Sequence, residues 1–310
     1  MKKQIFLLFY SKLIILSCVS ILSAQNVSPL QQMQKAISLI EQGDYLSRQG
    51  NVEKAITVYS EAIELNPRLA KAFVGRAIAF SNKNDFQNAI ADITQAINLT
   101  PGDYGNYIRR SHFYSKIFDF QRLIEDSTKS INLNPNAKVA YNNRGFGFIK
   151  LGKFEEAKAD FDKAIELDPK YSYPRNNLVL LLIKKKELKT ALDEINKVIE
   201  MDSDLPEAYQ NKGLIYLELE DFENALANFN RSLFYNPKLS SGYMNRAKTY
   251  ISISEFEKAL NDLNIAIDIE PNIWESYELR SIVYEKLGKI ERSVLDRSKA
   301  KELKILFPIQ

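Results

Sequence analysis

The sequence predicts an all-α protein, a single solenoid of eight stacked helix pairs. Three observations support this prediction. Apolar and small residues recur at fixed positions of a 34-residue unit, with the spacing of a helix face. Turn-forming residues separate two such runs within a unit. A fixed period of this length is typical of stacked repeats. The period itself is set by six prolines, separated from one another by multiples of 34 residues: Pro67, Pro101, Pro135, Pro169, Pro237 and Pro271.

Placing each proline at position 32 fixes the boundaries of the eight units. They run over 36–69, 70–103, 104–137, 138–171, 172–205, 206–239, 240–273 and 274–307. Ser203 occupies the one interior position where the ladder lacks its proline. Length alone would favour about two domains, but the unbroken phase favours one solenoid.

The first helix of a unit is predicted by positions 4, 8 and 11, which are mostly aromatic, small and bulky. In the fourth unit these are Tyr141, Gly145 and Phe148. Spacings of four, three and seven residues place them on one helical face. The small residue allows close approach of a second helix.

The second helix is predicted by a bulky residue at position 17, alanine at 20 and Ile or Leu at 28, as in Phe154, Ala157 and Ile165. Gly152 lies between the two runs and predicts the turn. The proline at position 32 is expected to end the second helix, because it lacks the N–H for the next backbone hydrogen bond.

These patterns resemble the tetratricopeptide repeat family, and the fourth unit matches its motif in full, with Tyr141, Gly145, Phe148, Ala157, Phe161, Ala164 and Pro169. The resemblance implies a right-handed superhelix of antiparallel helix pairs. The fifth unit departs at Arg175, Val179 and Ser203, which predicts irregular packing. The eighth unit departs at Ser293, Arg297 and Ile305, and its last helix is expected to form a polar cap.

Comparison of the units with one another predicts five structural ion pairs. Arginine at position 7 occurs with aspartate at position 23 in the same five units, which predicts a bidentate, partly buried pair joining the two helices. A row of ligand-binding arginines is the alternative. The pairs are Arg76 with Asp92, Arg110 with Asp126, Arg144 with Asp160, Arg246 with Asp262, and Arg280 with Asp296.

The first 24 residues are predicted to be an export signal. Lys2 and Lys3 precede an apolar run, and Ala24 ends a plausible cleavage site. A retained membrane anchor and lipidation of Cys18 are the alternatives, and membrane contact is expected only in those two cases. Residues 25–35 are expected to be a polar lead-in and residues 308–310 a short tail. The predicted location is extracytoplasmic, in the periplasm or cell envelope.

Charge and composition exclude several function classes. After removal of the leader, 39 basic and 39 acidic residues remain (42 − 3 against 39), so there is no basic surface for nucleic acid. Cys18 is the only cysteine and His112, at position 9 of its unit, the only histidine. We therefore expect no enzyme, no metal site and no cofactor.

The resemblance implies that positions 2, 5, 6, 9, 12 and 13 of the first helices line a concave groove. In units four to seven, amide side chains lie beside an apolar stripe, and an amide can pair with any peptide backbone. The predicted peptide-binding residues are Asn142, Asn143, Asn176, Asn177, Gln210, Asn211, Asn245, Phe146, Leu180, Leu214, Ile149, Ile183, Leu217 and Ile251. Amides that bond only to neighbouring helices are the alternative.

The sequence therefore predicts a non-enzymatic, exported scaffold that binds an extended peptide or protein segment in its groove. Two alternatives stay open. One is a structural subunit of a cell-envelope assembly that docks folded partners, and the other is a regulatory or binding subunit of an envelope enzyme complex.

Overall fold

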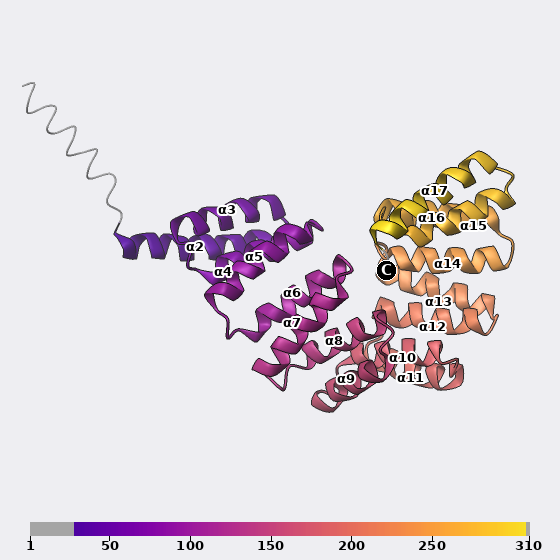
Figure 1. The fold of residues 1–310 in the computed structure, drawn as a ribbon, viewed down its shortest axis with the longest axis horizontal. Coiled ribbons are helices and arrows are strands. Elements are labelled where there is room, and N and C mark those ends of the chain that lie inside the picture. Colours follow the sequence, from indigo (N-terminus) through magenta and orange to yellow (C-terminus); the bar gives the residue numbers. More distant parts are fainter. Residues whose placement is uncertain (1–27, 308–310) are drawn as a thin grey trace, which may run out of the picture. The chain divides into compact units, whose positions relative to one another are not determined.

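A computed structural model describes residues 28–307, all of whose secondary structure is helical. The predicted leader and the tail at 308–310 lie outside these residues. The chain divides after Asn106 into two compact units, and each unit is described by itself. Figure 1 shows both as stacks of helix pairs, which confirms the all-α repeat architecture.

The first unit holds repeats 1 and 2 and the start of α6. Repeat 1 is α2 (Pro29–Arg48) with α3 (Val52–Leu65), and repeat 2 is α4 (Ala70–Asn82) with α5 (Phe86–Leu99). Helix α3 packs on α2 within its repeat and on α4 of the next repeat. This alternation of contacts, within a repeat and then between repeats, is what continues the stack.

The second unit holds most of repeat 3 and repeats 4 to 8. Each repeat again consists of a first and a second helix, and adjacent repeats pack through the second helix of one and the first helix of the next. The helices are α6 (Tyr104–Lys116), α7 (Phe120–Leu133), α8 (Lys138–Lys150), α9 (Phe154–Leu167), α10 (Ser172–Lys184), α11 (Leu188–Met201), α12 (Pro206–Glu218), α13 (Phe222–Tyr235), α14 (Ser240–Ser252), α15 (Phe256–Ile269), α16 (Trp274–Lys286) and α17 (Ile290–Leu306).

The turn between the two helices of a repeat has the same backbone conformation in all eight repeats. Position 15 has a positive φ of 58° to 74° whatever its residue type. Only three of these eight residues are glycine, namely Gly50, Gly152 and Gly288. The others, which include Phe118 and Glu220, accept the left-handed strain that non-glycine residues usually avoid.

The ends of the second helices show that proline is not the sole stop signal. Helix α11 ends at Met201, in register with the others, although Ser203 replaces the proline there. In repeat 8, where Ile305 takes that position, α17 continues to Leu306 and has 17 residues against 14 in the other second helices. In repeat 5 the second helix therefore ends in register without the proline.

The predicted polar lead-in is largely helical. Helix α2 begins at Pro29, and Ser28 caps it through a reciprocal pair of hydrogen bonds with Gln31. Such a capping box satisfies two helix-end groups at once. The first helix therefore starts seven residues before the repeat phase that the sequence predicts.

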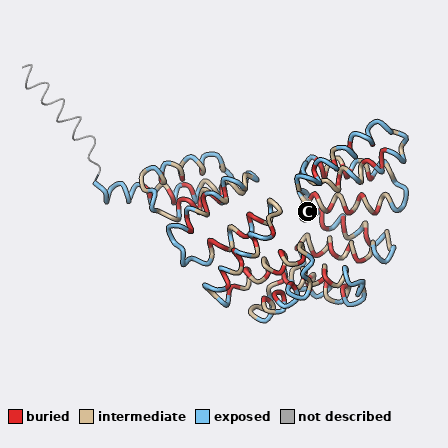
Figure 2. The backbone as a smooth tube through the Cα atoms, viewed as in Figure 1, coloured by how far each residue is buried: buried red, intermediate tan, exposed pale blue. Residues whose placement is uncertain are grey.

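The core of each repeat lies between its two helices, and Figure 2 shows buried residues on the helix sides that face one another. Tyr59 illustrates the packing at position 24. A Cβ added at Gly43 of its own repeat would lie 2.5 Å from the ring, and one at Gly75 of the next repeat 2.4 Å. Both helix backbones thus approach the ring closely, which small residues alone allow.

The last helix differs from the expected polar cap. Arg297 and Lys301 are polar and exposed as expected, but Val294, Ile305 and Leu306 are exposed apolar residues. The expectation of a uniformly polar outer face is therefore wrong. Position 21 is apolar in most repeats, and among residues 28–307 no helix covers Val294 at this position of α17.

Candidate functional site

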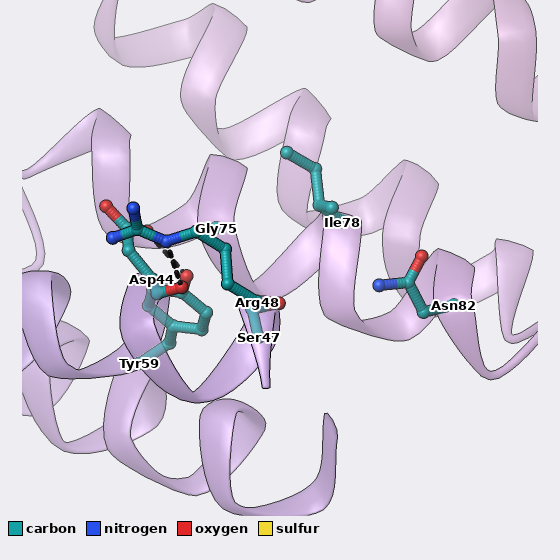
Figure 3. A pocket seen from close by; sticks show the side chains of 7 residues that line it. All are labelled: Asp44, Ser47, Arg48, Tyr59, Gly75, Ile78 and Asn82. Atoms are coloured by element: carbon teal, nitrogen blue, oxygen red, sulfur yellow. Dashed lines mark hydrogen bonds between the residues drawn. The ribbon is translucent and has the colours of Figure 1, made fainter. Parts of the chain in front are cut away.

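A recess of about 530 Å³ lies on the first helices of repeats 1 and 2 (Figure 3). Its lining comes from positions 6, 9, 12 and 13 of α2 and α4, together with position 24 of α3. These first-helix positions belong to the set that the family resemblance assigns to the groove. We call the surface made by positions 2, 5, 6, 9, 12 and 13 the first-helix face. The lining residues are Asp44, Ser47, Arg48, Tyr59, Gly75, Ile78 and Asn82.

A small hydrogen-bond network fixes one wall of the recess. The Tyr59 hydroxyl donates to Asp44 Oδ1 at 2.6 Å, and Arg48 Nε donates to the Asp44 carbonyl oxygen at 3.2 Å. Burial, and then the hydrogen bond to Asp44, raises the pKa of Tyr59. The hydroxyl therefore stays protonated and holds the carboxylate in place.

Gly75, Ile78 and Asn82 of α4 form the opposite wall of the recess. Gly75 has no side chain, so its backbone packs directly on the buried Tyr59 ring, and any side chain there would collide with it. Ile78 is 41% exposed and Asn82 is exposed one turn further along α4. Figure 3 shows both side chains separated from the Asp44–Tyr59 pair. The recess thus combines an apolar contact, an amide, a guanidinium and a carboxylate.

On repeats 4 to 7, the predicted amide row bonds mainly within the protein. Asn177 Nδ2 donates to Asn142 Oδ1 at 2.9 Å. One repeat later, Asn211 Nδ2 donates to Asn176 Oδ1 at 2.9 Å and to its carbonyl oxygen at 3.1 Å. These bonds link position 6 of one first helix to position 5 of the preceding one. The amides therefore hold neighbouring first helices in register.

The peptide-binding role predicted for four of these asparagines does not fit their burial. Asn142, Asn176, Asn211 and Asn245 are all buried. The reason is the close stacking of successive first helices, which covers one of each pair of amides. Asn143, Asn177 and Gln210 stay partly exposed, although Asn143 donates to Ser111 Oγ at 3.1 Å and Gln210 accepts from Ser241 at 3.0 Å.

The predicted apolar stripe is present but only half exposed. Ile149 is buried, which excludes it from direct surface contact. The remaining members are half-buried: Phe146, Leu180, Ile183, Leu214, Leu217 and Ile251.

A lysine beside this stripe was not predicted from the sequence. Lys150 Nζ lies 5.7 Å from the centre of the Phe120 ring and 5.8 Å from that of Phe146. Burial, and then the charge of Lys184, lowers the pKa of Lys150. Recurrent lysine at position 13, in Lys116, Lys150 and Lys184, is the sequence signal that would have found it.

All five predicted Arg–Asp pairs are present and bidentate. In each, Nε and Nη2 of the arginine donate to the two carboxylate oxygens at 2.7 to 2.9 Å. A third nitrogen often reaches position 25 of the preceding repeat, as in Arg76 to Ser60 and Arg280 to Asn264. The arginines thus join helices within and between repeats, which favours the structural interpretation over ligand binding.

Repeats 5 and 6 replace this pair in different ways. In repeat 5 Arg175, at position 4, lies 3.8 Å from Glu194. In repeat 6 Lys212 keeps only the link to the preceding repeat, through Asn196 at 2.8 Å. Arg175 stands where most repeats have an aromatic ring, and a recess of about 440 Å³ lies there between α9, α10 and α11. This is the irregular packing predicted for repeat 5.

Among residues 28–307, no group of three or more His, Cys, Asp or Glu side chains is placed to hold a metal ion. His112 lies exposed on α6, next to the Phe113 ring. No helix in this range is long and apolar enough to cross a bilayer.

Family models match four segments of the chain. A model described as "Tetratricopeptide repeat" matches residues 139–171, and another of that description matches 70–103 and 206–239. A third, described as "TPR repeat", matches residues 43–84. The chain is a tetratricopeptide repeat protein. No curated relative matches it.

Solved structures show the same fold. The structure of the APC/C hetero-tetramer Cut9-Hcn1 matches 86% of this chain with a TM-score of 0.61 and 14% identity, and this chain covers 54% of that one. PilF of Pseudomonas aeruginosa matches 66% of this chain and 94% of its own, at a TM-score of 0.54 and 17% identity. MamA from Desulfovibrio magneticus RS-1 matches 55% of this chain and 96% of its own, at a TM-score of 0.50 and 21% identity. At these identities the similarity establishes the fold alone.

Tetratricopeptide repeat proteins are generally non-enzymatic and typically bind other proteins. The fold is therefore that of a protein–protein interaction scaffold.

Proposed function

We propose that this protein is an exported, non-enzymatic scaffold that binds an extended segment of a partner protein on its first-helix face. The recess of repeats 1 and 2 is the anchor of this interaction. The observation that carries the proposal is the composition of that recess, in which polar groups that suit a peptide backbone lie beside an exposed apolar side chain.

The recess offers each kind of contact that an extended segment needs. The Asn82 amide both donates and accepts, so it can bond to the N–H and C=O of a peptide whatever its sequence. Ile78 gives an apolar contact for one partner side chain. Arg48 adds a cation for a carboxylate or a carbonyl oxygen, and guanidinium groups bind carboxylates well.

The architecture makes this wall rigid before binding. Asp44 is held by Tyr59, and the Tyr59 ring is clamped between the backbones of Gly43 and Gly75. A preorganised site loses less conformational entropy on binding than a flexible one. The half-buried apolar stripe of repeats 4 to 7 is a second surface of the same kind.

Export rests on the sequence of residues 1–24, which carry Lys2 and Lys3 before the apolar run that ends at Ala24. Sequencing the N-terminus of the protein purified from its own cells tests this part. A chain that begins at Gln25 supports export with cleavage, whereas a chain that begins at Met1 contradicts it.

A peptide-display screen tests the binding function. The two lining residues Ile78 and Asn82 are changed to Ser and Ala. The matched control carries Leu99→Ser and Asn98→Ala, which alter one exposed apolar residue and one exposed asparagine on α5 of the same repeat. Peptides that bind the wild type and the control but not the first variant support the proposal. Enrichment that survives the Ile78 and Asn82 changes contradicts it.

A further inference from the structure

The first and last helices that the structure describes, α2 and α17, each expose several apolar residues. On α2 these are Leu30, Met33, Ile37 and Tyr45. On α17 they are Ile290, Val294, Leu295, Ile305 and Leu306, with Ile305 at 80% exposure. Clusters of exposed apolar residues of this kind mark interaction surfaces.

Position 10 of the first helix shows that, among residues 28–307, no second helix packs on the outer face of α2. Tyr45 occupies this position in repeat 1 and is 59% exposed. The equivalent residues of repeats 2 and 4 to 8 are all buried, namely Ala79, Gly147, Leu181, Ile215, Thr249 and Val283. Position 3 behaves in the same way, since Ser38 is exposed whereas Ala72, Ala140 and Ala208 are buried. The uncovered face of α2 is therefore the one that receives a second helix elsewhere.

The interior junctions define which positions meet when a second helix packs on the next first helix. A Cβ at Gly147, position 10, would lie 2.8 Å from Ile124, position 21. Position 24 lies against position 6, as Tyr59 lies against Gly75. Position 28 lies against position 3, as Leu233 lies 2.8 Å from a Cβ at Gly242.

A polar contact completes this register. Position 25 bonds to position 7, as Asn230 accepts from Arg246 at 2.6 Å. These four position pairs give the register of the interior junctions, and they can be applied to α17 and α2.

We propose that α17 of one molecule packs on α2 of a second copy of this chain in the register of the interior junctions. Position 21 then places Val294 against Tyr45, which covers both exposed side chains. Position 24 places Arg297 against Glu41, a pair of opposite charge. Position 25 places Ser298 beside Gln42, and position 28 places Lys301 beside Ser38.

The lengths of the two terminal helices support this partner. Helix α2 has 20 residues where other first helices have 13, and the added turns are at its N-terminus. Helix α17 is extended at its C-terminus. The two helices pack antiparallel in this register, so the added turns meet. Ile305 and Leu306 then lie beside Met33.

The charges favour this head-to-tail pairing over two identical ends. Pairing α17 with another α17 would bring Arg297, Lys301 and Lys304 of both copies together. The contact is heterologous, so a pair of copies keeps one free α2 and one free α17. Assembly therefore continues until a ring closes or a filament grows.

Disulfide trapping tests the register. In a Cys18→Ser background, one variant carries Tyr45→Cys and another Val294→Cys, and the two are mixed and oxidised. We expect a 45–294 disulfide-linked pair in the mixture. The control replaces Val294→Cys with Ile253→Cys, another exposed apolar position. No linked pair, or an equal yield with the control, overturns the proposal.

A charge exchange tests the same contact without cysteines. Glu41→Arg and Arg297→Glu each place like charges opposite one another, and each alone should weaken self-association at least about tenfold in sedimentation velocity. Mixing the two variants restores opposite charges at every junction and should restore association. A wild type that stays monomeric at every concentration, or single variants that associate as the wild type does, overturns the proposal.

Discussion

Replacing Asp160 by alanine tests the role of the Arg–Asp pairs in holding the repeats together. Asp160 accepts two hydrogen bonds of 2.8 Å from Arg144, and its side chain is 7% exposed. Arg144 is 21% exposed and also reaches Thr128 of the preceding repeat at 3.3 Å. The substitution leaves the guanidinium between the Tyr141 and Phe148 rings without its counter-ion.

The expected loss of stability follows from this burial. Removing one partner of a buried ion pair costs about 3–5 kcal/mol, because the other charge is stranded. Since Arg144 keeps part of its surface in water, we expect the lower end, about 3 kcal/mol. The double variant Asp160→Ala with Arg144→Met strands neither charge and should recover part of this loss.

Asp162 provides the matched control two residues away on α9. It pairs with Lys158 at 2.7 Å, but both side chains are about half exposed, at 52% and 53%. Asp162→Ala should therefore cost only about 0.3–0.5 kcal/mol. Urea unfolding, with hydrogen exchange of the amides of α8 and α9, measures both variants, since repeat arrays do not always unfold in one step. Equal effects at the two positions would refute the reasoning.

Three further predictions concern the packing, the turn and a half-buried phenol. Gly75→Ala should destabilise the protein by about 1–3 kcal/mol, because the new Cβ would lie 2.4 Å from a buried ring, whereas Gly102→Ala meets nothing within 4 Å and should be nearly neutral. Glu220→Gly should stabilise it by about 1 kcal/mol by relieving a φ of 58°, and Glu223→Gly, within α13, should cost about 1 kcal/mol. Thermal and urea unfolding measure the stability of these four variants. If Glu220→Gly and Glu223→Gly change the free energy of unfolding in the same direction, the turn explanation is wrong. Burial raises the pKa of Tyr171 from 10.0 to about 12, so the unfolded chain loses this proton first and stability falls between those pH values. Tyr171→Phe should lessen that fall in urea unfolding at alkaline pH, and an unchanged fall would contradict the assignment.

The repeat phase could be predicted from the sequence because many positions of each unit carry the same residue types. A ring such as Phe161 needs a small residue opposite it, at Gly145, so both recur in each unit. The Arg–Asp pairs could be predicted for the same reason, since a change in one partner accompanies a change in the other.

The burial of the amides could not be predicted from a one-repeat pattern. Whether Asn176 faces a ligand or its neighbour Asn211 depends on the offset between successive first helices, which the sequence of a single unit does not specify. The recess of repeats 1 and 2 was missed for a related reason. It depends on Tyr59 and Gly75 coming together from different repeats.

The ends of the stack depart from the periodic pattern. The helical start at Pro29 rests on the capping bonds of Ser28 and Gln31, which lie before the repeat phase begins. The exposure of Val294 follows from its place at the last helix, although its residue type fits the interior pattern.

Site-specific photo-crosslinking tests the central claim most directly. A benzophenone side chain is placed at residue 78, on the first-helix face, or at residue 99, on α5, and each protein is illuminated with a peptide enriched in the display screen. We expect crosslinks from residue 78 and few from residue 99. Crosslinks that form from residue 99 and not from residue 78 would contradict binding on the first-helix face.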